Sequence, residues 1–210
     1  VKAFEERLPF KYTKGQQVVN AEIEKDLSNK YPMHRLLQGE VGSGKTVVAL
    51  RAMLSVVDSG GQAALLAPTE VLAQQHYRTI KKLLGELADA GTLQAGAIGT
   101  SVALLTGSMT SAQKKEIHAN LASGQIGIVI GTHALISDGV AFADLGLVVV
   151  DEQHRFGVEQ RDALRMKAKQ PPHLLVMTAT PIPRTVAMTI FGDLDTSTLR
   201  ELPGLSLIHI

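Results

Sequence analysis

The sequence contains no cysteine among its 210 residues. This absence excludes disulfide frameworks, thiol nucleophiles and cysteine-ligated zinc, and it is compatible with a reducing cytoplasm, where we expect the protein to work. No run approaches the roughly 18 uncharged apolar residues that a membrane helix needs. The first ten residues also contain charges where a signal peptide would be apolar. We therefore expect no membrane partner.

An excess of charge of one sign is also lacking. Lys and Arg number 21 and Asp and Glu 20, so the formal net charge is +1. A small, broadly basic nucleic-acid binder carries a large positive excess, because its affinity comes from displacing counterions from phosphates. Any nucleic acid must therefore be held locally. With 45% hydrophobic and 20% charged residues, the composition is that of one large globular domain and excludes a disordered tail or a coiled coil.

Apolar runs of strand length alternate with segments of helical period along the chain. The runs are nearly unbroken, as expected of strands buried on both faces of a parallel sheet. Strand candidates cover residues 35–37, 63–67, 102–105, 126–130, 147–150 and 174–177, and helix candidates cover 19–27, 46–57, 70–84 and 110–123. This order predicts an α/β fold with a mostly parallel sheet and helices on both faces. Residues 89–100 are rich in Gly, Ala and Thr and predict a surface loop.

A glycine-rich stretch follows the first strand candidate and opens a helix. Its residues are Gly39, Glu40, Val41, Gly42, Ser43, Gly44, Lys45 and Thr46, which match the phosphate-loop pattern G-x-x-x-x-G-K-[ST]. The three glycines let the backbone curl, so that N–H groups and the positive helix end converge on the β- and γ-phosphates. Lys45 supplies a point charge to the phosphates, and the Thr46 hydroxyl is placed to ligate Mg²⁺. The stretch predicts a site for a nucleoside triphosphate with Mg²⁺.

Paired carboxylates end a later strand candidate. Asp151 and Glu152 follow four apolar residues at a strand's carboxyl end, where open α/β sheets place their ligands. Asp151 is placed to hold Mg²⁺, directly or through water, and Glu152 to polarise a water for in-line attack on the γ-phosphate. A kinase needs a site for another acceptor, and a nucleotide switch usually lacks the second carboxylate. About a hundred residues separate Lys45 from Asp151, which suits the RecA-like core of motor ATPases better than a small GTPase.

Several short motifs occur in a fixed order along the chain. They are Leu8-Pro9-Phe10 with Thr13 and Gln16, and residues 37–46, 67–70, 131–136, 151–158 and 178–185. Over about residues 8–203 the chain thereby resembles the first motor domain of the RecG family of bacterial DNA helicases, within superfamily 2. The related transcription-repair coupling factor Mfd typically has Gly-Tyr-Gly-Lys-Thr in the phosphate loop and Asp-Glu-Glu-Gln at the carboxylates. Ser43 and residues 151–154 favour RecG.

The resemblance implies roles for residues that the spacing alone does not assign. Gln16 lies where this superfamily reads adenine, and its amide could pair with adenine N6 and N7. Phe10 or Tyr12 could stack on the base, although either could instead pack against the first helix. Thr69 and Thr132 would hold the sugar-phosphate backbone of DNA through hydroxyl and N–H groups. Taken singly, each threonine is more often just a helix N-cap.

A second set of implied roles concerns coupling between the nucleotide and the DNA. Thr178 and Thr180, together with His154, resemble residues that link the nucleotide site to the DNA face. As a lone histidine, His154 would otherwise be a surface imidazole. Arg155 and Arg184 belong to the matching strings but receive no role beyond ion pairing or phosphate contact.

The resemblance also sets expectations for organisation and activity. Residues 1–203 are expected to form a helicase ATP-binding domain, and 204–210 a tail that departs from the family pattern; a second RecA-like motor domain and a wedge domain would lie outside these residues. ATP would drive the remodelling of branched or forked DNA, by fork regression and branch migration, in recombination and repair. Hydrolysis by this lobe alone would be weak, because the arginine finger comes across the cleft from the second lobe. Two alternatives remain: a catalytically incompetent nucleotide-binding fragment, or the motor lobe of another superfamily 2 remodeller, such as Mfd or an RNA helicase.

Overall fold

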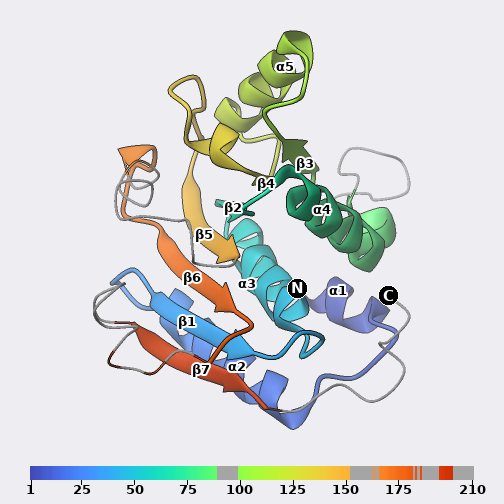
Figure 1. Cartoon of the computed structure of the whole chain (residues 1–210), viewed down its shortest axis with the longest axis vertical. Coiled ribbons are helices and arrows are strands. Elements are labelled where there is room, and N and C mark those ends of the chain that lie inside the picture. The colour runs from blue at the N-terminus through green and yellow to red at the C-terminus, as the bar shows by residue number, and fades with distance from the viewer. Residues whose placement is uncertain are drawn as a thin grey trace.

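The computed structural model of the chain describes residues 1–88, 99–151, 163, 166–181, 183, 185 and 194–200. Seven strands form one sheet in the order β3-β4-β2-β5-β6-β1-β7, and every pair of neighbouring strands is parallel (Figure 1). They are β1 (His34–Gly39), β2 (Gln62–Leu66), β3 (Val102–Leu105), β4 (Ile128–Gly131), β5 (Leu145–Asp151), β6 (His173–Thr178) and β7 (Asp195–Leu199). The six strand candidates are confirmed, whereas β7 was not foreseen.

The helices begin where local capping chemistry allows. They are α1 (Lys2–Arg7), α2 (Lys14–Leu27), α3 (Lys45–Asp58), α4 (Glu70–Leu84) and α5 (Ser111–Ala122), with short 3₁₀ turns η1 (Gly85–Ala88) and η3 (His133–Ile136). Thr13 with Gln16 and Thr110 with Gln113 form capping boxes at α2 and α5. Thr69 caps α4 by accepting a hydrogen bond from the backbone of Leu72. The α1 helix was not foreseen, and the predicted loop over 89–100 lies outside the described residues except for Gly99 and Thr100.

A separate apolar core lies on each face of the sheet. On one face, helices α1 to α4 bury Phe4, Ile23, Met53 and Ile80 against alternate strand residues such as Leu65. On the other face, α5, η3 and the segment before β5 cover the remaining strand residues through side chains that include Leu121, Leu135 and Phe142. Helices therefore cover both faces, as predicted, and strands buried on both sides need the nearly unbroken apolar runs of this sequence.

Parallel pairing brings the predicted motifs to one edge of the sheet. In β1 and β6, Gln38 lies opposite Thr178, and in β5 and β6, Asp151 lies opposite Met177. The strand that enters the phosphate loop and the strand that ends in Asp151 are thus separated only by β6. Their carboxyl ends form the crevice in which sheets of this kind bind ligands.

The edge strand β7 is held by a partly buried ion-pair cluster. Arg35 on β1 is only 8% exposed, and its guanidinium donates to Asp26 at 2.6 and 2.8 Å and to the Ser197 hydroxyl at 2.7 Å. Glu22 completes the cluster, since it pairs with Arg35 at 3.3 Å and accepts a hydrogen bond from Ser197. Strand β7 is mostly polar, and it is thereby held by the Arg35 guanidinium on the neighbouring strand β1 together with two carboxylates on α2.

No helix in the part of the chain that the structure describes is long and apolar enough to cross a membrane.

The first testable consequence of the fold concerns His173 at the start of β6. Its Nδ1 accepts a hydrogen bond from the backbone N–H of Met33 at 2.8 Å, so this nitrogen must be unprotonated. Burial lowers the pKa of His173 from 6.5; Asp26 opposes the shift and His34 adds to it. A histidine whose pKa falls on folding stabilises the fold fully above its unfolded pKa of about 6.5 and progressively less below it.

We therefore expect the thermal midpoint of the wild type to fall relative to that of His173→Asn between pH 7 and pH 5. The Asn carboxamide oxygen can accept the same hydrogen bond and does not titrate. Loss of one such bond, about 1 kcal/mol, corresponds to about 2–4 °C in a domain of this size. Circular-dichroism melts at several pH values measure the difference, and parallel pH profiles for the two proteins would contradict it.

Candidate active site

The loop between β1 and α3 curls in a way that only glycine permits easily. Gly42 and Gly44 have φ angles of 86° and 83°, in the left-handed region that other residues rarely adopt. The Ser43 N–H closes a turn on the Glu40 carbonyl at 3.1 Å, and Gly44 caps α3. The loop consequently delivers the amino end of α3, which is the positive end of the helix dipole, to the edge of the sheet.

Lys45 folds back over this loop. Its Nζ donates hydrogen bonds to the carbonyl oxygens of Gly39 at 2.6 Å and Glu40 at 2.9 Å. Two backbone dipoles thus hold the ammonium group at the loop, where the sequence predicts the phosphates. An incoming phosphate is a stronger acceptor than a neutral carbonyl, because both partners of the bond are then charged.

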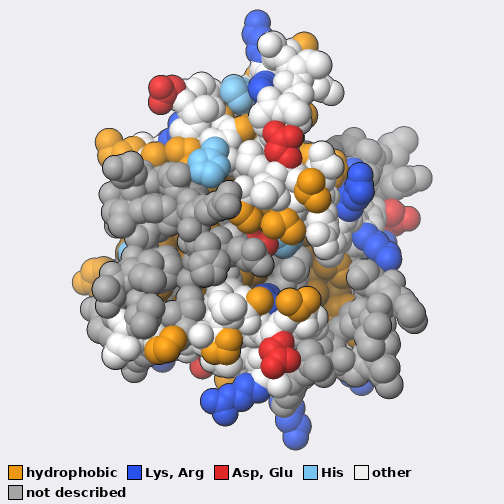
Figure 2. Space-filling model, in the orientation of Figure 1, with side chains coloured by type: hydrophobic (Ala, Val, Ile, Leu, Met, Phe, Trp, Pro, Cys, Tyr) orange, Lys and Arg blue, Asp and Glu red, His pale blue; other side chains and the backbone are white. Residues whose placement is uncertain are grey.

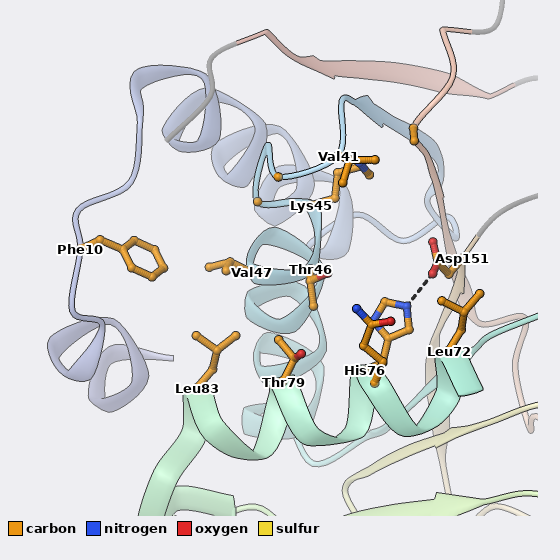
Figure 3. Close-up of a pocket in the computed structure, with 14 residues that line it drawn as sticks. Phe10, Val41, Lys45, Thr46, Val47, Leu72, His76, Thr79, Leu83 and Asp151 are labelled. Carbon is orange, nitrogen blue, oxygen red and sulfur yellow. Dashed lines mark hydrogen bonds and ion pairs between the residues drawn. The ribbon is translucent and has the colours of Figure 1, made fainter. Parts of the chain in front are cut away.

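A cavity of about 280 Å³ opens beside the loop (Figure 3). Its lining includes Lys45 and Thr46 from α3 and Asp151 from the end of β5. Helix α4 forms a wall through Leu72, His76, Thr79 and Leu83, whose spacing of three or four residues places them on one face of the helix. Phe10 lies at the opposite end of the cavity from Asp151 in this view.

Two oxygen-bearing side chains of the lining suit Mg²⁺. Thr46 offers a hydroxyl and Asp151 a carboxylate, and both line the same space as the loop. Mg²⁺ prefers oxygen ligands and is usually bound by one or two carboxylates together with phosphate oxygens and water. Thr46 and Asp151 are the side chains that would hold it.

Asp151 makes an unforeseen contact with helix α4. The Nε2 atom of His76 lies 2.5 Å from Asp151 Oδ2, and each side chain is only 14% exposed (Figure 3). The pair spans 75 positions of the sequence, and nothing in the motif pattern points to His76. Only the packing of α4 beside the end of β5 brings the two residues together.

Gln16 contacts the phosphate loop directly. It is 1% exposed; its Nε2 donates to the Ser43 carbonyl at 3.0 Å, and its Oε1 accepts from the Thr13 N–H at 3.0 Å. Adenine recognition by Gln16 stays a prediction, and in this conformation the amide joins α2 to the loop. Phe10 lines the cavity, and both Phe10 and Tyr12 pack against the core. Burial of Tyr12, reinforced by the Glu5 carboxylate, raises its pKa to about 12.

Two of the predicted coupling residues form a tight local arrangement after β6. Thr178 is buried, and its hydroxyl lies 3.1 Å from that of Thr180 and accepts from the Thr180 N–H at 3.2 Å. Because Thr178 directly follows Met177, which lies opposite Asp151, this turn adjoins the end of β5. Glu152 and His154 lie outside the described residues, as do Arg155 and Arg184.

The two threonines predicted to contact DNA lie after adjacent strands. Thr69 follows β2, is exposed, and caps α4 through a 3.3 Å bond from the Leu72 N–H. Thr132 follows β4, precedes η3 and is 8% exposed. Because β2 and β4 are parallel neighbours, the two positions share the carboxyl edge of the sheet. Their proposed contacts with DNA stay predictions.

Glu70 links two elements at the carboxyl edge of the sheet. Its carboxylate accepts hydrogen bonds from the Ser108 hydroxyl at 2.6 Å and the Ser108 N–H at 3.0 Å, which lower the pKa of Glu70. The turn after β3 is thereby tied to the start of α4. In the view of Figure 2, the coloured Lys and Arg side chains are spread out, most of them near the margin, and are not gathered in one patch.

Known proteins are similar to this chain over most of its sequence. The sequence pattern of the DEAD/DEAH box helicase family matches residues 13–189. The chain is 65% identical over 199 residues to the ATP-dependent DNA helicase RecG of Mycobacterium tuberculosis (strain ATCC 25618 / H37Rv), covering 94% of this chain and 27% of that protein. It is 52% identical over 199 residues to RecG of Aquifex aeolicus (strain VF5), covering 94% of this chain and 24% of that protein.

The fold is shared as well. A structure of RecG bound to a three-way DNA junction superimposes with a TM-score of 0.80 at 43% identity, covering 97% of this chain and 26% of that one. The chain belongs to the DEAD/DEAH box helicase family. Its resemblance to RecG and its RecA-like fold are thereby confirmed, and it spans about a quarter of the length of the RecG proteins that it matches.

Gly39 provides a test of how tightly the phosphate loop is packed. A Cβ atom at this position would lie 2.5 Å from Ser43 Oγ and 3.1 Å from the Leu199 Cβ. Ser43 is 1% exposed, and its buried hydroxyl has no hydrogen-bond partner among the residues that the structure describes. We expect Gly39→Ala to cost about 1–3 kcal/mol of unfolding free energy, the usual range for overpacking.

Removal of the obstructing hydroxyl should recover most of that loss. Ser43→Ala alone should change stability little, because no hydrogen bond is broken, and Gly39→Ala with Ser43→Ala should approach the wild type. Urea denaturation of the four proteins measures the coupling. If the double variant is as unstable as the sum of the two single variants, the two positions do not collide.

Proposed function

We propose that this chain is the ATP-binding and hydrolysing motor lobe of a DNA helicase that remodels branched DNA. The observation that carries the proposal is the single cavity that Lys45, Thr46 and Asp151 line together with the phosphate loop. The chemistry of these groups matches a triphosphate with its metal. The similarity to proteins named ATP-dependent DNA helicase supports ATP as the nucleotide.

Each residue of the lobe has a separable task in this reaction. The amino end of α3 and the loop N–H groups bind the phosphates, and Lys45 exchanges two backbone carbonyls for phosphate oxygens. Thr46 and Asp151 would hold Mg²⁺, which would supply positive charge to neutralise the phosphates. Glu152, next to Asp151 in the sequence, orients and polarises the attacking water. Gln16 reads the adenine, and Phe10 stacks on it.

DNA lies along the carboxyl edge of β2 and β4 in this proposal. Thr69 and Thr132 follow these strands, and their hydroxyl and N–H groups can donate hydrogen bonds to the sugar-phosphate backbone without fixed charge. DNA binding through uncharged groups is compatible with a net charge of +1. Thr178 and Thr180, with His154, would connect this edge to the nucleotide.

The remaining parts of the activity belong to the full-length protein. The RecG proteins are about four times as long as the matched segment, and one of them is described bound to a three-way DNA junction. We propose that a second RecA-like lobe supplies the arginine finger and that branched DNA is the substrate, in fork regression and branch migration. The site of action would be the cytoplasm, where bacterial DNA is processed.

Nucleotide binding is tested with Lys45→Ala. Loss of a charged hydrogen-bond donor to the phosphates costs about 1.5–3 kcal/mol, so affinity for a fluorescent ATP analogue should fall at least about tenfold. Lys30→Ala removes the same charge from an exposed loop and serves as the matched control. Equal affinities of Lys45→Ala and the wild type would remove the phosphate-loop assignment.

The substrate is tested with the full-length protein that contains this chain. We expect forked DNA to stimulate its ATP turnover more than linear duplex of the same length does, while the 210-residue lobe alone turns over weakly. Equal rates on forked and linear DNA would contradict the branched substrate, and stronger stimulation by single-stranded RNA would assign the lobe to an RNA helicase. A full-length protein that binds ATP without turnover would support the catalytically incompetent alternative.

A further inference from the structure

We propose that His76 is a positioning residue for the metal-binding carboxylate. Its Nε2–H holds Oδ2 of Asp151, so that the other carboxylate oxygen is the one offered to Mg²⁺. The inference rests on the proposed function, because it concerns how the same site is assembled. The contact is direct, at 2.5 Å, and it lies inside the cavity that the phosphate loop also lines.

The chemistry of the pair fixes the hydrogen-bond roles. An ionised carboxylate only accepts hydrogen bonds, so Nε2 of His76 must carry the proton. A hydrogen bond to a charged acceptor is roughly twice as strong as one between neutral groups. With both side chains 14% exposed, water competes poorly for this bond. His76 can therefore restrain the Asp151 side chain before any metal arrives.

The surroundings of His76 make it a firm support. Helix α4 is anchored along the stripe next to the cavity-facing one by Ala73, Ile80 and Leu84, each completely buried in the core. The cavity-facing stripe of the helix, which contains His76, is consequently held at a fixed distance from the end of β5. A carboxylate at the end of a strand can rotate about two bonds, and a donor on a rigid neighbouring helix removes that freedom.

Direct binding of the metal by His76 is a poorer assignment. Imidazole nitrogen suits zinc, copper and iron, whereas Mg²⁺ selects oxygen ligands. Groups that hold a metal's ligands in place generally lie one step away from the ion, and their removal typically lowers metal affinity by about 10- to 100-fold. His76 has the contact and the chemistry of such a group.

The test compares three substitutions by the Mg²⁺ concentration needed for half-maximal binding of a fluorescent ATP analogue. His76→Leu removes the donor and should raise this midpoint about tenfold, with little change in binding measured without Mg²⁺. His76→Gln places an amide N–H at a similar reach and should stay within about threefold of the wild type. His118→Leu makes the same exchange on α5, outside the cavity, and should leave the midpoint unchanged.

The Asp151→Asn background tests whether His76 acts through the Asp151 carboxylate or affects the site in some other way. In that background His76→Leu should produce no further shift, because the two changes act on one interaction. Thermal melts without nucleotide check the fold of each variant. Should His76→Leu fail to fold, His76→Asn, whose donor is one bond shorter, replaces it with the same expected midpoint shift.

Two results would overturn the proposal. One is a His76→Leu midpoint equal to that of the wild type, and the other is equal impairment of His76→Leu and His76→Gln, which would assign the effect to ring packing. If the wild type binds no nucleotide with or without Mg²⁺, the proposed function itself fails. That outcome is distinguishable because it precedes any comparison among variants.

Discussion

The common direction of the seven strands is the constraint on which the site depends. Backbone hydrogen bonds between parallel strands fix their register, so the last residue of each strand arrives at one edge of the sheet. Gly39, Asp151 and Thr178 are far apart in the sequence, yet they are the last residues of β1, β5 and β6, which lie side by side in the sheet. No side chain needs to bring them together, because pairing of the main chain has already done so.

The phosphate loop is organised by contacts with its surroundings before any ligand binds. Helix α3 is anchored beneath it by buried residues such as Val48, Leu50 and Met53. The Gln16 amide holds the Ser43 carbonyl from one side, and Lys45 closes over the carbonyls at the start of the loop. A loop that is already shaped loses little conformational entropy when a phosphate binds, and this favours affinity.

The sequence predicts most of this architecture because its signals are local. Unbroken apolar runs identify six strands, and Thr69 and Gly85 bracket α4 at its observed bounds. Strand β7 escapes prediction because Asp195–Leu199 is mostly polar and is held by Arg35, which lies 162 positions before Ser197. The contact between His76 and Asp151 is equally hidden, since it depends on which face of α4 meets the end of β5. Local pattern thus predicts elements and motifs, whereas contacts between distant elements emerge only from their packing.

The position of β1 in the sheet has a consequence for how the chain folds. This strand leads into the phosphate loop, yet its two neighbours, β6 and β7, are the last two strands along the part of the chain that the structure describes. Pairings of such long sequence separation are slow to form, because the loop between them must close first. During synthesis, both edges of β1 stay unpaired until β6, which ends at Thr178, has left the ribosome, and one edge stays unpaired until β7, which ends at Leu199, has followed. The nucleotide site therefore belongs to the final stage of folding, and nascent chains that stop before β7 would be unable to complete it.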